Sequence, residues 1–204
     1  MTAAEVQRTF VALHVSDAVT EALVSAQEAL KHRLELAEQS RRAGLSVRWI
    51  VRQQMHVTLC FLGDTRSDQL EPLRREMAEL AHDRAALRLA LGETLQIFGS
   101  PRRARALVAS VVGPDVAELA ELQRALAARL KQHGFEPDRR PYTPHITLAR
   151  VKPAGDVQHW LVEEALHLPS EKFLGETLRF YRSTLTPRGG VYDLLAEVPL
   201  VTKR

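Results

Sequence analysis

A tetrapeptide pattern that occurs twice in this chain sets strong limits on its fold. His56-Val-Thr-Leu and His145-Ile-Thr-Leu each place a β-branched residue between a histidine and a threonine. In a β-strand successive side chains point to opposite faces, so each histidine shares a face with its threonine, and the aliphatic pair anchors the other face. Two such copies arise by chance on the order of 1 in 10⁴ at this composition. The pattern therefore predicts two related strands, each carrying an imidazole and a hydroxyl on one surface.

The segments around both motifs follow a similar order of helix, motif strand, helix and paired strands. Apolar and β-branched runs predict strands at 8–15, 47–51, 55–62, 87–98, 105–112, 145–151, 177–185 and 191–198. Apolar spacing and capping signals predict helices from 16 towards 44, around 70–80, from a cap at Asp115 to Gly134, and at 156–166. No linker or low-complexity tract divides the chain. We expect an α+β fold of two related lobes in a single domain, 1–204.

The composition excludes several classes of protein. The hydrophobic fraction of 45% and the charged fraction of 26% are those of soluble globular proteins. The N-terminal residues have no apolar signal core, and no apolar stretch approaches the roughly 18 residues of a membrane span. One cysteine, Cys60, excludes an internal disulfide, and no cluster has the spacing of a zinc site. We expect a cytoplasmic, monomeric protein with no membrane contact, no metal and no cofactor.

Arginine is strongly preferred over lysine in this chain. The planar guanidinium suits phosphate recognition, so an anionic ligand is one explanation. A compositional bias towards arginine on solvated helix faces explains the preference equally well.

Two histidines of this kind suit phosphodiester chemistry. A neutral imidazole takes a proton from water, an imidazolium gives one to a leaving oxygen, and both forms are accessible near neutrality. Threonine hydroxyls on the same face can donate to the non-bridging phosphate oxygens. Either motif alone is better explained by a half-buried structural strand, and it is their repetition that favours a shared catalytic role.

Both motifs resemble the His-x-Thr/Ser signatures of the 2H phosphoesterase superfamily. The chain is most similar to its RNA 2′,3′-cyclic phosphodiesterase family, also called the 2′-5′ RNA ligase family. The similarity extends to the opening strand, both motif blocks and the closing hairpin, at 8–13, 47–50, 55–63, 141–150 and 183–192.

This resemblance implies two pseudo-symmetric lobes of antiparallel sheet with outer helices around a central cleft, one motif facing it from each lobe. It also implies that the substrates are RNA ends or nucleotides with a 2′,3′-cyclic phosphate, opened to a 2′-phosphate. His56 is then the proton donor to the leaving oxygen and His145 the proton acceptor from water. Thr58, Thr147 and Arg150 bind the phosphate. Strict alternation points Arg150 away from His145, so its role requires a bend or the end of the strand. A solvated arginine at this position is the equal alternative.

Other side chains are weaker candidates for contact with RNA. Arg102, Arg103 and Arg105 form a basic cluster that suits an RNA backbone or a plain charged turn. Three aromatic residues are candidates to stack on a base or to pack in the core: Phe10, Tyr142 and Tyr192. Parity places Cys60 on the His56 face, although a lone cysteine in a strand is usually a small core residue. The remaining histidines on predicted helices or their ends are expected at the surface: His32, His82, His133, His159 and His167.

Two other functions fit the same residues. The histidine pair equally serves reversible 2′-5′ ligation or cleavage of 2′-5′ linkages, because one acid and one base run either direction. A nucleotide-binding module that uses the cleft without turnover is the alternative from a different class.

Overall fold

The structure, a computed structural model, describes residues 6–36, 46–136, 138, 140–157, 167–186 and 189–202. In these residues the helices are α1 (Asp17–Leu36), α3 (Leu70–His82) and α4 (Val116–Gln132). The strands are β1 (Val6–Leu13), β2 (Ser46–Trp49), β3 (Val57–Arg66), β4 (Leu87–Ser100), β5 (Arg103–Val112), β6 (His145–Gly155), β7 (Lys172–Gly175), β8 (Thr177–Thr186) and β9 (Gly189–Pro199).

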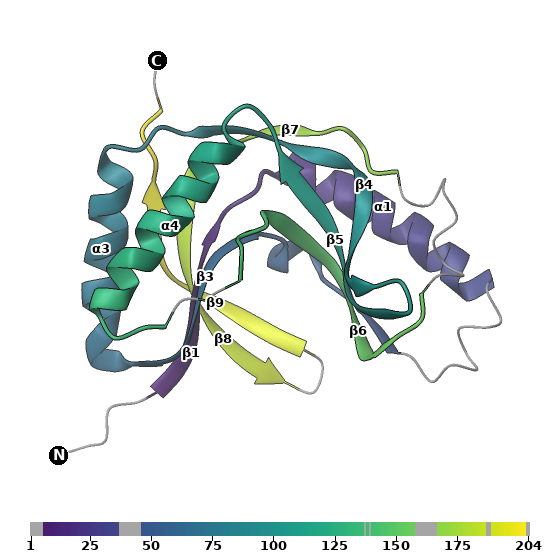
Figure 1. Cartoon of the computed structure of the whole chain (residues 1–204), viewed down its shortest axis with the longest axis horizontal. Coiled ribbons are helices and arrows are strands. Elements are labelled where there is room, and N and C mark those ends of the chain that lie inside the picture. Colours follow the sequence, from purple (N-terminus) through teal and green to yellow (C-terminus); the bar gives the residue numbers. More distant parts are fainter. Residues whose placement is uncertain are drawn as a thin grey trace.

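All of these strands belong to one antiparallel sheet, in the order β7-β4-β5-β6-β3-β1-β8-β9, with β2 paired to β6. The sheet divides into two lobes that join where β3 meets β6 through the residue pair Val57↔Ile146. Helices α3 and α4 cover the lobe of β1, β3, β8 and β9, whereas α1 lies against the other lobe (Figure 1). The predicted α+β fold with two antiparallel lobes and outer helices is confirmed.

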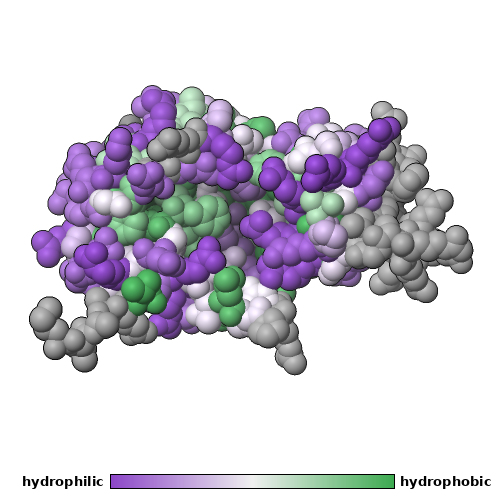
Figure 2. All heavy atoms as spheres, turned by 60° about the horizontal axis from the view of Figure 1, so that its bottom comes forward, coloured by the Kyte–Doolittle hydropathy of each residue, from purple (hydrophilic) through white to green (hydrophobic). Residues whose placement is uncertain are grey.

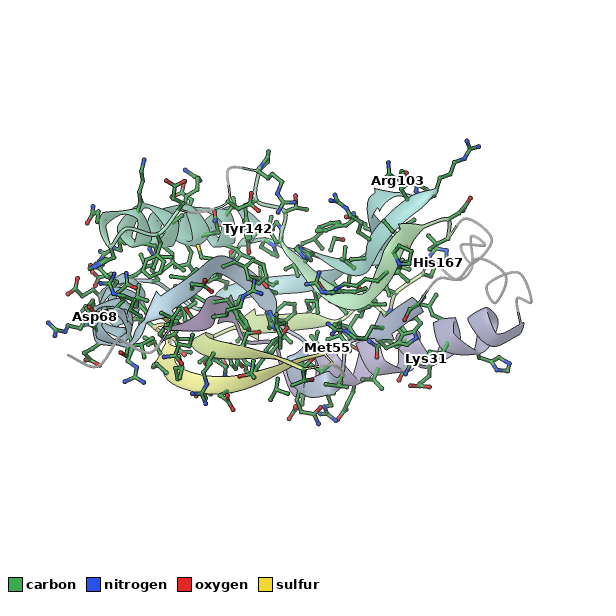
Figure 3. The ribbon with its side chains drawn as sticks, turned by 90° about the horizontal axis from the view of Figure 1, so that it is seen from below. Lys31, Met55, Asp68, Arg103, Tyr142 and His167 are labelled. Carbon is green, nitrogen blue, oxygen red and sulfur yellow. The ribbon has the colours of Figure 1, made fainter. Side chains whose placement is uncertain are left out.

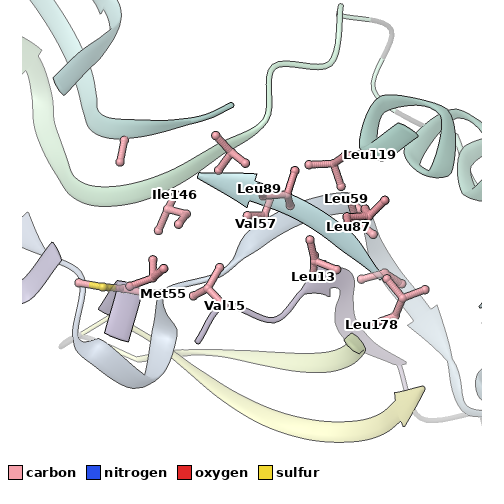
Figure 4. Packing of buried hydrophobic residues seen from close by; sticks show 14 of the residues in the cluster. Leu13, Val15, Met55, Val57, Leu59, Leu87, Leu89, Leu119, Ile146 and Leu178 are labelled. Atoms are coloured by element: carbon pink, nitrogen blue, oxygen red, sulfur yellow. The ribbon is translucent and has the colours of Figure 1, made fainter. Parts of the chain in front are cut away.

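Apolar faces of helices and strands meet in a continuous core. The predicted stripe of α4 is fully buried and consists of Leu119, Leu122, Leu126 and Leu130. The aliphatic residues of both motifs, Val57 and Ile146, are also completely buried. Figure 4 shows them packed near Leu13, Leu89 and Leu119, so the back of each motif strand anchors it in the core. Burying a side chain of this size contributes about 1.5–3 kcal/mol, which fixes the register of both motif strands.

Several local expectations differ from the structure. A 3-10 turn, Arg52–Gln54, precedes β3, which begins at Val57 rather than at Met55. Asp115 precedes α4 but makes no side-chain capping bond, because its carboxylate accepts hydrogen bonds from the backbone and guanidinium of Arg88. Strand β7 was not predicted. Most of the helix expected at 156–166 and part of the closing turn lie outside the described residues.

The expectation that His133 is a simple surface residue is wrong. Its Nε2 lies 2.9 Å from Glu76 Oε1, and Arg129 Nη1 lies 2.8 Å from the other oxygen of that carboxylate. Half-buried Glu76 thus ties the end of α4 to α3. The side chains of His32, His82 and His167 are exposed as expected, and His159 lies outside the described residues. None of the described helices has the length and apolarity needed to cross a membrane.

Candidate active site

The two motif strands lie side by side and antiparallel. His56, Thr58, His145 and Thr147 are half-buried, while the aliphatic residues between and after them are buried, as strand alternation predicts. Because Val57 pairs with Ile146, extending the register by one residue each way sets His56 across from Thr147 and Thr58 across from His145. All four polar side chains therefore share one face of the sheet, with an approximate two-fold relation about the Val57–Ile146 pair.

Both imidazole rings are oriented by the same backbone contact. His56 Nδ1 donates to the carbonyl of Gln54, and His145 Nδ1 donates to the carbonyl of Thr143, each at 2.7 Å. A carbonyl oxygen only accepts, so Nδ1 carries the proton in the neutral ring and Nε2 keeps its lone pair. Nε2 of His56 lies 3.0 Å from the Thr58 hydroxyl, which donates to it in this tautomer. On each motif the ring nitrogen that can accept a proton is thus Nε2.

Aromatic side chains surround His56 in particular. Phe10 stacks on its ring at 4.9 Å between centroids, Tyr192 approaches edge-on at 5.7 Å, and Tyr181 lies at 6.2 Å. His145 has Phe98 at 4.4 Å. Burial lowers the pKa of His56 to about 4, aided by the positive charges of His145 and Arg150 and opposed by the bond to Gln54. Burial also lowers the pKa of His145, again with a contribution from Arg150.

A β-bulge occurs at the same position in each motif. In β3, Cys60 pairs with Val11 and Thr58 with Ala12, so Leu59 is the extra residue. In β6, Ala149 pairs with Leu107 and Thr147 with Val108, so Leu148 is the extra residue. Each bulge falls on the leucine that closes its motif, and it reverses which face the following side chains occupy.

The bulge at Leu148 turns Arg150 back towards the histidines. Arg150 pairs with Ala106, which shares a face with Val108 and therefore with Thr147. Its positive charge on this face contributes to the lowered pKa of both His56 and His145. The bulge at Leu148 is therefore the bend that a role for Arg150 at the phosphate requires.

The bulge at Leu59 has the opposite consequence for Cys60. Its side chain is buried on the helix-covered face, where its thiol lies 3.8 Å from Gln123 Nε2 of α4. The expectation that Cys60 shares the His56 face is therefore wrong, because it assumed unbroken alternation.

Comparison with known proteins assigns this chain to a family. The model of the 2'-5' RNA ligase superfamily matches residues 23–186. This chain belongs to that superfamily. The resemblance noted from the two motifs is thereby confirmed.

Two relatives and a solved structure match most of this chain. An RNA 2',3'-cyclic phosphodiesterase of Thermotoga maritima is 29% identical over 191 residues, 93% of this chain and 94% of the relative. One of Geobacillus stearothermophilus is 35% identical over 158 residues, 75% of this chain and 48% of that relative. The crystal structure of TT0787 of Thermus thermophilus matches with a TM-score of 0.75 at 27% identity, over 97% of this chain and 100% of that one.

Phe61 was not among the aromatic residues predicted to contact RNA. It occupies the place in the first motif that Arg150 occupies in the second, five residues after the histidine. Its partner across β1 is Phe10, and its side chain is 61% exposed on the His56 face. The internal symmetry of the two motifs was the available signal, since a bulge in one copy implies a bulge in the other.

Gln27 was also missed, because its contacts are distant in sequence. Its side chain is 3% exposed, and its Nε2 donates to the carbonyls of Ile50 and Leu148, both at 2.8 Å. Leu148 is the bulged residue, and its carbonyl also accepts from the backbone of Ile50. The buried amide of α1 thus holds the bulge that directs Arg150.

The other sequence candidates have mixed outcomes. The hydroxyl of half-buried Tyr142 donates to the carbonyl of Thr58 at 3.2 Å, so it braces the first motif. Phe10 is buried against His56, and Tyr192 lies at the edge of that ring. Arg103, the first residue of β5, points away from Tyr142 in Figure 3.

The lower side of the molecule in Figure 1 is brought forward in Figure 2. Hydrophilic residues lie on both lobes there, with a hollow between the lobes.

Proposed function

We propose that this chain is an RNA 2′,3′-cyclic phosphodiesterase that opens the cyclic phosphate to a 2′-phosphate with two histidines. The observation that carries the proposal is the shared face of His56 and His145, with each Nδ1 anchored and each Nε2 left for chemistry. Membership of the superfamily and the names of its relatives support the same activity. Both motifs lie in one sheet of one chain, so we also propose that a monomer suffices.

The reaction needs one proton acceptor and one proton donor. His145 Nε2 accepts a proton from water, and the water oxygen forms a bond to phosphorus while the bond to the 3′ oxygen breaks. His56 Nε2 gives its proton to that departing oxygen. The product carries a 2′-phosphate and a free 3′ hydroxyl. These roles follow the family resemblance, and both proton transfers are provided without a metal.

Three further side chains bind the phosphate in this proposal. Thr58 and Thr147 donate to non-bridging oxygens, and for this the Thr58 hydroxyl leaves His56 Nε2 when substrate binds. Arg150 supplies a positive charge on the same face. Because a bound anion favours the protonated ring, it raises the pKa of His56 from its low value in the free protein and lets it hold the donated proton.

Exposed Phe61 gives the substrate base a place to stack. An aromatic ring projecting beside the reacting phosphate is the usual device for holding an unpaired base, worth about 1–3 kcal/mol. Its position opposite Phe10, which itself stacks on His56, sets the base on the first lobe.

The product of the reaction tests this function directly. The protein is incubated with adenosine 2′,3′-cyclic phosphate and with an RNA ending in a cyclic phosphate, both in EDTA, and the product is analysed by chromatography. We expect adenosine 2′-phosphate and an RNA 2′-phosphate end. A 3′-phosphate product contradicts the direction of ring opening, and activity restored only by added metal contradicts the two-histidine mechanism. Joining of RNA halves without hydrolysis favours ligation, and tight binding without turnover favours a binding module.

A further inference from the structure

Two arginines lie side by side at the edge of the second lobe. Arg48 of β2 pairs directly with Arg150 of β6, between the pairs Val47↔Val151 and Trp49↔Ala149. Residues directly opposite on neighbouring strands project to the same face, with Cβ atoms about 5 Å apart. Since the bulge turns Arg150 onto the histidine face, Arg48 lies on that face as well.

This pairing is unfavourable unless an anion compensates it. Like charges directly opposite each other destabilise a sheet. Many arginines of this chain have carboxylate partners: Arg52, Arg88, Arg129, Arg179 and Arg182 each lie within 3.0 Å of one. Across the part of the chain that the structure describes, Arg48 and Arg150 have neither an ion pair nor a side-chain hydrogen bond, and both are exposed. Two uncompensated guanidiniums thus sit beside the proposed phosphate site.

Arg48 extends towards the first lobe. A Cβ added at Gly189, at the start of β9, would lie 2.6 Å from Arg48 Nη1, so the guanidinium rests on that backbone. The carbonyl of the next residue, Gly190, accepts a hydrogen bond from the side chain of Gln54, whose own carbonyl anchors His56. Arg48 therefore reaches from β2, beside β6, to the first residue of β9.

Arg48 lies on β2, which carries neither histidine, whereas Arg150 lies on β6 with His145. Arg150 follows His145 on the same strand, whereas Arg48 extends to the backbone of Gly189 in β9. The two guanidiniums are thus arranged as an inner and an outer cation on one surface. A single cyclic phosphate engages the inner one, which leaves the outer one for a second anionic group.

We propose that Arg48 binds the phosphodiester on the 5′ side of the terminal nucleotide, one nucleotide away from the cyclic phosphate. The proposal rests on the proposed function, which sets the cyclic phosphate beside Arg150 and the histidines. The next phosphate of an RNA strand is carried by the 5′ oxygen of the same ribose, so it lies one sugar away. A planar guanidinium with free donors suits that group. The preferred substrate is therefore an RNA chain rather than a cyclic mononucleotide.

A matched pair of substrates tests this subsite. Adenosine 2′,3′-cyclic phosphate lacks the 5′ phosphodiester, and the dinucleotide ApA with a 2′,3′-cyclic end contains it. We expect Arg48→Ala to lower the ratio of kcat/KM on the dinucleotide to that on the mononucleotide by about tenfold or more, the loss of one charge-assisted contact. Arg48→Gln, which keeps the stem, is expected to behave alike. Arg75→Ala, at an exposed arginine of the outer helix α3, serves as the control and leaves the ratio unchanged.

The salt dependence provides an independent readout. Each phosphate contact on a single strand adds about 0.7 to the slope of log affinity against log salt. Arg48→Ala is expected to reduce that slope by about this amount for the dinucleotide and not for the mononucleotide. An unchanged substrate ratio with an unchanged slope overturns the subsite.

Binding of the products separates this subsite from the proposed activity. Calorimetric affinities of ApA 2′-phosphate and adenosine 2′-phosphate are compared for the wild type and the Arg48 variants. A wild type that turns over neither substrate refutes the proposed function, yet a dinucleotide preference lost in the variants still supports the subsite. Equal loss of affinity for both products contradicts it, whatever the turnover.

Discussion

Val57 of β3 and Ile146 of β6 form the residue pair through which the two lobes of the sheet join. Each follows its motif histidine directly, so the same pair that closes the sheet brings His56 and His145 to one surface. The polar faces of both strands point away from the buried aliphatic side chains. The core contacts that position the strands therefore also position the imidazoles, without a separate loop to carry either one.

The low pKa of His56 predicts a loss of stability in acid. The unfolded chain binds a proton near the ordinary pKa of 6.5, whereas the folded protein does so only near 4. The free energy of unfolding is therefore highest above about 6.5 and falls by up to about 3 kcal/mol as the pH drops towards about 4. The lowered pKa of His145 acts in the same direction. Urea denaturation at pH 7 and pH 4.5 measures the effect.

A variant assigns this acid sensitivity to His56. His56→Asn removes the titrating group, so its stability is expected to fall less between the two pH values than that of the wild type. His82→Asn, at a histidine whose side chain is 84% exposed, keeps the full loss. An equal loss in the His56 variant contradicts the assignment.

Gln27 is expected to act on the reaction through Arg150. Gln27→Met fills a similar volume but withdraws both donors, which frees the Leu148 bulge and loosens the direction of Arg150. We expect kcat/KM on the cyclic phosphate to fall about tenfold and the stability to fall by about 1–3 kcal/mol. Gln123→Met, at a half-buried glutamine of α4 that contacts the Cys60 thiol, is the matched control with normal kcat/KM.

A double-mutant cycle separates positioning from general damage. If Gln27 works through Arg150, Gln27→Met has little further effect on kcat/KM in the Arg150→Ala background, while its effect on stability persists. Additive losses in kcat/KM indicate instead that Gln27 supports the fold alone.

Phe61 is expected to contribute to binding rather than to the chemical step. Phe61→Ala removes the exposed ring and should raise KM about tenfold with little change in kcat, whereas Phe61→Tyr retains a stacking face and stays near the wild type. Initial rates over a range of adenosine 2′,3′-cyclic phosphate concentrations separate the two parameters. A lower kcat at unchanged KM contradicts a stacking role. Leu185→Ala, at a 67% exposed residue of β8, controls for the loss of surface apolar area.

Local patterns predicted much of this molecule, because they depend on neighbours in the sequence. Strand alternation gave the half-buried histidines and buried aliphatic residues of both motifs, and helical spacing gave the buried stripe of α4. The bulges were not predicted. In the structure each one leaves two consecutive residues buried, Leu59-Cys60 in β3 and Leu148-Ala149 in β6. Strict alternation gives the wrong face for residues that follow a bulge. It therefore misplaced Cys60 and pointed Arg150 away from the histidines.

Long-range contacts account for the rest of what the sequence left open. The aromatic ring cluster at His56 forms because β1 pairs with β8 and β8 with β9, which connects Phe10, Tyr181 and Tyr192. The contact of His133 with Glu76 requires α3 and α4 to pack together. Neither arrangement follows from local propensity, since both depend on the order of strands and helices in the finished fold.

The pairing of the two histidines is tested most directly by the initial rate on adenosine 2′,3′-cyclic phosphate. His56→Ala and His145→Ala are each expected to lower kcat by about 10²–10⁴-fold, the usual contribution of one positioned proton-transfer group. Since the two act on one phosphate, the double variant should be little slower than either single variant. His82→Ala serves as the control with an unchanged rate. Near-normal turnover in either folded motif variant contradicts the two-histidine account.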